Sequence, residues 1–132
     1  MAKRIALDSG ALIKLSDGDP LTRAVVRKWT EERWETIVPA PVLAETLRGG
    51  HADARVHRIL SSRKTSVTVV GVSEKAGRDA GERLGAAGMP PKNTVDALIV
   101  ATAVAERAEH ILTGDPADLR QLAGTDVKII AI

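Results

Sequence analysis

Apolar residues along the chain follow two kinds of pattern: short β-branched runs, and longer stretches in which they recur every three or four residues. The short runs predict strands at residues 4–7, 36–38, 66–72, 110–113 and 127–132. Apolar spacing at residues 21–34, and helix-forming composition with start signals elsewhere, predict helices at residues 11–15, 21–34, 41–48, 52–62, 73–87, 93–106 and from 116 onward. Strands and helices alternate, with no Asn-Gly hairpin turn and no internal repeat. This order predicts one α/β domain over residues 1–132, a three-layer α/β/α sandwich around a mainly parallel central sheet.

Two of these segments are apolar enough to be predicted as fully buried. Residues 66–72 form a continuous β-branched run, typical of a strand covered on both faces of a parallel sheet. Residues 95–105 are apolar on every helical face except at Asp96 and Thr102, which predicts an interior helix. An ionised Asp96 in the first turn of that helix is costly unless it is paired or bound to a metal ion. The alternative is that Asp96 only stabilises the N-terminal end of the helix dipole.

Three other acidic residues follow predicted strands. Asp8 comes directly after the first strand, Asp115 follows the fourth across one glycine, and Glu45 lies in the helix after the second. Because parallel strands end at the same edge of a sheet, these three side chains are predicted to share one rim. Asp96 joins them if its helix starts at that rim. Asp8 and Asp115 could instead be helix N-caps, but Glu45 is not at a capping position, so a shared site accounts for all four.

The ligand chemistry of such a site follows from its side chains. The chain has no cysteine, and His51 and His57 are not spaced as a zinc-binding pair. Clustered carboxylates are hard oxygen ligands, which favour Mg²⁺ or Mn²⁺. A divalent ion lowers the pKa of a bound water and stabilises charge on an attacked phosphate, so the sequence predicts phosphodiester hydrolysis.

Composition limits the choice of partner. The net charge of +2 is too small to indicate nucleic-acid binding by itself. Trp29 and Trp34 are the only aromatic residues, and we interpret them as packing or subunit contacts rather than base-stacking platforms. The arginines of residues 55–63 are interpreted as a solvated helix face in preference to a phosphate site. The N-terminal residues show neither a signal peptide nor a membrane span, which favours a cytoplasmic protein without a membrane partner.

Four segments, in order, resemble the PIN-domain nucleases: residues 5–13, 38–49, 95–101 and 111–119. In size the chain is similar to the toxin of a VapBC-type toxin–antitoxin pair. The resemblance implies a PIN-like fold, Mg²⁺- or Mn²⁺-dependent endoribonuclease activity on an RNA substrate, homodimerisation and a cognate antitoxin. It assigns the catalytic and metal-binding roles to Asp8, Glu45, Asp96 and Asp115. Supporting roles fall to Thr113, Asp118 and Ser9, and we select Arg48, just after Glu45 in the same predicted helix, as a phosphate contact.

The sequence departs from the family pattern at Gly10, where many relatives have Ser or Thr, and at Asn93, where similar sequences often have an acid. Both departures bear on metal affinity. They support an alternative in which the chain is a catalytically degenerate PIN domain that binds RNA or protein. Phosphoryl transfer onto an aspartate of the chain itself, as in haloacid phosphatases or receiver domains, fits less well, because Gly10 stands where haloacid phosphatases have their second Asp. The strand at 66–72 also lacks the Asp of receiver domains.

Overall fold

A computed structural model describes residues 2–132. Its centre is a five-stranded sheet in the order β3-β2-β1-β4-β5, and every neighbouring pair of strands is parallel. The strands are β1 (Arg4–Leu7), β2 (Glu35–Pro39), β3 (Val67–Val70), β4 (His110–Thr113) and β5 (Lys128–Ala131). The prediction of a mainly parallel sheet from the alternation of elements is therefore confirmed.

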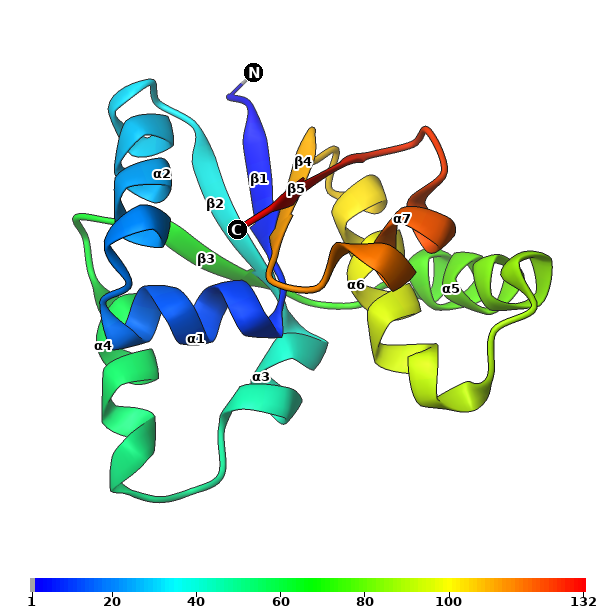
Figure 1. Cartoon of the computed structure of the whole chain (residues 1–132), viewed down its shortest axis with the longest axis horizontal. Helices are drawn as coiled ribbons and strands as arrows, with labels where there is room; N and C mark the ends of the chain where they lie inside the picture. Colours follow the sequence, from blue (N-terminus) through cyan, green and yellow to red (C-terminus); the bar gives the residue numbers. More distant parts are fainter. Residues whose placement is uncertain (1) are drawn as a thin grey trace.

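Helices cover the sheet in two groups (Figure 1). The first group is α1 (Ser9–Asp17), α2 (Pro20–Glu31) and α4 (Ala54–Ser61). The second is α5 (Glu74–Ala87), α6 (Thr94–Ala105) and α7 (Pro116–Ala123). The short helix α3 (Ala40–Thr46) packs against α1 and α6 and so connects the two groups. Two 3₁₀ turns, η1 (His51–Asp53) and η2 (Pro91–Asn93), lead into α4 and α6.

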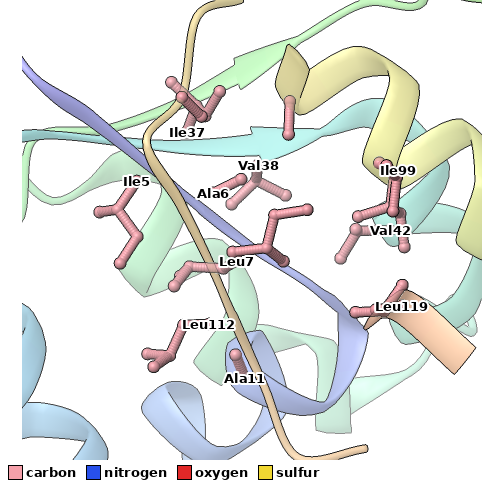
Figure 2. Close-up of a cluster of buried hydrophobic side chains, with 14 of the residues drawn as sticks. Ile5, Ala6, Leu7, Ala11, Ile37, Val38, Val42, Ile99, Leu112 and Leu119 are labelled. Atoms are coloured by element: carbon pink, nitrogen blue, oxygen red, sulfur yellow. The ribbon is translucent and has the colours of Figure 1, made fainter. Parts of the chain in front are cut away.

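The core is centred on β1, the middle strand. Ile5, Ala6 and Leu7 are completely buried. Figure 2 shows these side chains among the following residues of neighbouring strands and helices: Ile37, Val38, Val42, Ile99, Leu112 and Leu119. Complete burial of a Leu or Ile side chain contributes about 1.5–3 kcal/mol. This packing fixes the carboxyl end of β1, and with it the position of the residue that follows.

Helix α6 is an interior helix, as its apolar faces predict. Ala97, Val100 and Ala103 are buried, and the helix packs against β2, β4, α5 and α7. Its first turn carries Asp96, which is half-buried. The apolar character of the segment therefore places one carboxylate at the boundary of the core.

The prediction that residues 66–72 are buried on both faces is wrong. The strand is β3, which pairs only with β2 and forms an edge of the sheet, with Thr68 and Val69 exposed. β-Branched side chains favour the extended backbone whether or not a layer covers them. Composition thus identified the strand correctly but not its place in the sheet.

Several helix boundaries also differ from the prediction, among them those of α1 and α3. Helix α1 begins at Ser9 rather than at residue 11, because Asp8 caps it and Gly10 adopts helical geometry. Helix α3 ends at Thr46 rather than at residue 48, because Leu47 is extended. Both differences lie beside the candidate site.

The tryptophans pack at the amino-terminal ends of the strands, opposite the end where the predicted site lies: Trp34 directly precedes β2, and its partner His110 is the first residue of β4. Trp34 stacks on His110 with ring centroids 5.3 Å apart, and Trp29 lies 6.0 Å from each of those rings. Their interpretation as packing residues agrees with this arrangement. Among residues 2–132, no helix combines the length and apolar character that a membrane crossing requires.

Candidate functional site

Asp8 is the most enclosed acidic side chain of the predicted site. It follows β1, occupies the N-cap position of α1 and is only 9% exposed. Its Oδ1 accepts a hydrogen bond of 2.9 Å from the backbone N–H of Ala11, and its Oδ2 accepts one from the hydroxyl of Thr113. The capping interpretation is therefore correct for Asp8, but capping occupies only one of its two carboxylate oxygens.

Thr113 connects the ends of two neighbouring strands. It is the last residue of β4 and completely buried. Besides donating to Asp8, its hydroxyl accepts a hydrogen bond of 3.0 Å from the backbone N–H of Asp115. Thr113, to which the resemblance assigns a supporting role, thus contacts the carboxylate of Asp8 and the backbone of Asp115.

Burial is the main cause of a raised pKa at Asp8. The hydrogen bonds from Thr113 and Ala11 lower the pKa, while the negative charges of Glu45 and Asp115 raise it. A bound cation would stabilise the ionised form of a buried carboxylate that has like charges nearby. It would offset both the cost of removing the carboxylate from water and its repulsion by the neighbouring acids.

Glu45 is exposed and reaches the site from α3. Its Oε1 accepts a hydrogen bond from the hydroxyl of Ser9, the first residue of α1. Figure 1 shows α3 and the beginning of α1 together below the carboxyl end of β1. Glu45 therefore lies at the predicted rim, and Ser9 orients it.

Asp96 interacts with the same group of charges from the other side. Burial raises the pKa of Asp96, and the charges of Glu45, Asp118 and Asp8 raise it further, against a hydrogen bond from Asn93 that lowers it. The Nδ2 of Asn93 donates to Oδ2 of Asp96 over 3.3 Å and to Oδ2 of Asp118 over 3.0 Å. Asp118 thereby enters the site from α7.

The role of Asn93 as a donor between two acids is the feature that sequence reasoning missed. The sequence offered only one signal, the three-residue spacing from Asn93 to Asp96, which is compatible with a contact across one helical turn. The link to Asp118, 25 residues away, depends on how α7 packs on α6.

The remaining predicted residues lie further out. Asp115 is exposed and occupies the N-cap position of α7, as the capping alternative predicts, but its side chain makes no capping hydrogen bond. Arg48 is exposed and directs its guanidinium to the carbonyl oxygens of Ala44 and Leu47, each 2.9 Å away, at the end of α3. Phosphate contact by Arg48 requires that it leave these carbonyls.

Within residues 2–132, none of the five carboxylates at or near the site forms an ion pair with a Lys or Arg side chain. Six ion pairs join Arg to Asp or Glu within residues 2–132, and none includes Asp8, Glu45, Asp96, Asp115 or Asp118. In the same part of the chain, no three Asp, Glu or His side chains are grouped so that they could hold a metal ion as they stand. The oxygen-only donor set fits Mg²⁺ or Mn²⁺, and these acids lie within electrostatic range of one another without forming a closed set of ligands.

Comparisons with known proteins agree with this fold. The sequence matches the model of the PIN domain family over residues 5–124. No curated protein sequence matches it. Nineteen chains of solved structures match.

Three of these structures illustrate the likeness. A chain from the structure of VapBC2 from Rickettsia felis, which is bound to a DNA fragment of the VapBC2 promoter, has a TM-score of 0.74 at 16% identity, with 98% of each chain covered. A chain of DNA-bound VapBC from Salmonella typhimurium has a TM-score of 0.72 at 16% identity, covering 99% of this chain and 98% of that one. A chain of a toxin–antitoxin complex from Klebsiella pneumoniae has a TM-score of 0.70 at 17% identity, with 96% of each chain covered.

At these identities the solved structures attest the fold, whereas the family match rests on the sequence itself and extends from the second residue of β1 to the end of α7. The chain belongs to the PIN domain family.

Proposed function

We propose that the protein is an Mg²⁺- or Mn²⁺-dependent endoribonuclease that hydrolyses RNA phosphodiester bonds and acts as the toxin of a toxin–antitoxin pair. One observation carries the proposal: Asp8 and Asp96, both withdrawn from solvent, share the field of neighbouring acids and have no Lys or Arg partner within residues 2–132. PIN domains are typically nucleases and generally use divalent metals.

The residues divide the work according to their exposure. Asp8 and Asp96 would be the inner ligands, since their positions are fixed by Thr113 and Asn93. Glu45 and Asp115 are exposed and would complete the ligand set from the rim. The bound ion would lower the pKa of a water and stabilise charge on the phosphate. Mg²⁺ retains several water ligands and is also coordinated by substrate phosphates, so it does not require a complete set of protein ligands.

Replacement of Asp8 tests the proposal. Asp8→Asn retains an oxygen that can cap α1 but removes the charge, and we expect it to abolish Mg²⁺-dependent RNA cleavage and growth inhibition while the fold persists. Asp19→Asn is a matched control, because Asp19 caps α2 in the same way, accepting from the N–H of Thr22, away from the site. Cleavage by Asp8→Asn at the wild-type rate would remove Asp8 from the mechanism.

We propose a cognate antitoxin as the protein partner, since the similar solved structures come from VapBC and toxin–antitoxin complexes. A groove of about 740 Å³ between α2, α4 and the segment before β3 suits such a partner. Its floor is apolar, with Leu15, Val26 and Ile59. Four basic residues and one acid also line it, which leaves an excess of positive charge: Arg23, Arg27, Arg58, Lys64 and Glu31. An amphipathic acidic segment would complement both surfaces.

Charge reversal tests this docking surface. We expect Arg27→Glu combined with Arg58→Glu to weaken the binding of the protein encoded by the adjacent small open reading frame, with RNA cleavage retained. Arg78→Glu, which alters an exposed arginine of α5, is the control. Equal binding by both variants would place the partner elsewhere. Homodimerisation is part of the proposal and is tested by light scattering of the purified protein.

The second candidate is a degenerate PIN domain that only binds RNA or protein. Asn93 favours it, because a neutral amide stands between Asp96 and Asp118. Titration calorimetry with Mn²⁺ separates the two candidates, since a binding module has no need of a metal ion.

A further inference from the structure

Asn93 stands at the N-cap position of α6 but does not cap it. The residue is 6% exposed, and its side chain makes no capping hydrogen bond. Asn is preferred at this position because its side-chain oxygen accepts from a backbone N–H of the first turn. Here the amide nitrogen is instead directed at two carboxylates, Asp96 of the same helix and Asp118 of α7. The side chain therefore connects two helices rather than completing one.

The two contacts use the two protons of the Asn93 amide. The NH₂ group has two protons, so one nitrogen can donate to both carboxylates at once. A serine hydroxyl has a single proton, and an ionised aspartate has none to donate. Without the amide, Asp96 and Asp118 would face each other as like charges with nothing to hold them in place.

We infer that Asn93 is a positioning residue for the proposed metal centre: its amide fixes Oδ2 of Asp96 and holds Asp118 beside it, so that Asp96 would present a fixed carboxylate to the cation. The inference rests on the proposed function and deepens it. It also gives Asp118 a definite part, as the carboxylate that anchors the amide from α7. Partners of metal ligands that act in this way typically change metal affinity about 10–100-fold when they are replaced.

Asn93→Ser separates positioning from capping. Serine caps helices about as well as asparagine, so a residue that served only α6 would tolerate the change in every measurement. We expect the midpoint of thermal unfolding without metal to stay within a few degrees, and the Kd for Mn²⁺, measured by calorimetry, to rise about 10–100-fold. An unchanged Kd in Asn93→Ser, when the wild type binds Mn²⁺, overturns the inference and leaves the proposed function standing. Absence of Mn²⁺ binding by the wild type overturns the proposed function instead.

A measurement without metal tests the contact to Asp118 directly. Asn93 is the only asparagine of the chain, so ¹⁵N-asparagine labelling gives a single side-chain amide pair in the NMR spectrum. We expect Asp118→Ala to shift this pair and to speed its exchange with water, while Asp126→Ala, which removes an exposed acid bound to Arg83, leaves it unchanged. Two results together would overturn the inference: no shift of the amide pair in Asp118→Ala, and exchange in the wild type as fast as that of a solvent-exposed amide.

Discussion

The hydroxyl of Thr113 donates a hydrogen bond to Oδ2 of Asp8 and so joins the carboxyl ends of β4 and β1 at the middle of the sheet. Both residues are buried, and they are 105 positions apart in the chain. The contact leaves the only nearly enclosed carboxylate of the proposed site with a fixed orientation.

Thr113→Val should therefore destabilise the protein. The substitution preserves the shape of the side chain but leaves a buried carboxylate oxygen without its donor, at a cost of about 1–3 kcal/mol in the free energy of unfolding. Urea denaturation measures this difference.

The control is Thr102→Val in α6. The hydroxyl of Thr102 is buried and has no hydrogen-bond partner within the described residues, so its replacement by a methyl group should be neutral or stabilising. Equal losses in the two variants would mean that the bond to Asp8 carries no stability.

The pH dependence of stability without metal should be altered by Asp8. Its pKa in the folded protein lies above the ordinary value of 3.8, so between these two pKa values the folded state holds a proton that the unfolded state has released. Stability from this group is therefore highest at acid pH and falls as the pH rises from about 4. Asp96 acts in the same direction.

Asp8→Asn removes this contribution. In EDTA at pH 7 we expect the variant to unfold at a higher temperature than the wild type, and the difference to shrink as the pH falls toward 4. Asp19→Asn should show the opposite sign, because hydrogen bonds from Thr22 lower the pKa of Asp19. Thermal melting curves between pH 4 and pH 7 measure these differences. A melting temperature of Asp8→Asn below that of the wild type at pH 7 would contradict the raised pKa of Asp8.

Gly10 offers a stabilising substitution beside the site. A Cβ at this position would lie 3.7 Å from Oδ1 of Asp8 and from the N of Gly114, which is ordinary contact. Gly10→Ala within α1 should raise the free energy of unfolding by about 0.5–1 kcal/mol. Gly18→Ala should lower it, because Gly18 has φ +81° and a Cβ there would lie 3.2 Å from the guanidinium of Arg23. A loss of stability in Gly10→Ala would show that the glycine is required for close packing at the site.

The fold was predictable from the chain because alternating strands and helices leave few arrangements other than a covered parallel sheet. The position of Asp8 at the carboxyl end of a strand was predictable for the same reason, since Asp8 directly follows β1; that β1 is the central strand came from the structure. The exposure of β3 was not predictable, because its β-branched residues favour a strand equally at the edge or in the middle of a sheet. Contacts of Asn93 and Arg48 depend on side-chain rotamers and helix packing, which no pattern of apolar residues specifies.

Titration of Mn²⁺ into the metal-free protein at pH 7, followed by calorimetry, tests the central proposal most directly. We expect saturable binding to the wild type, and binding at least about tenfold weaker in Asp8→Asn and Asp96→Asn, with Asp19→Asn like the wild type. Absence of binding in the wild type, or equal affinity in all four proteins, would contradict the proposal that these carboxylates form a metal centre.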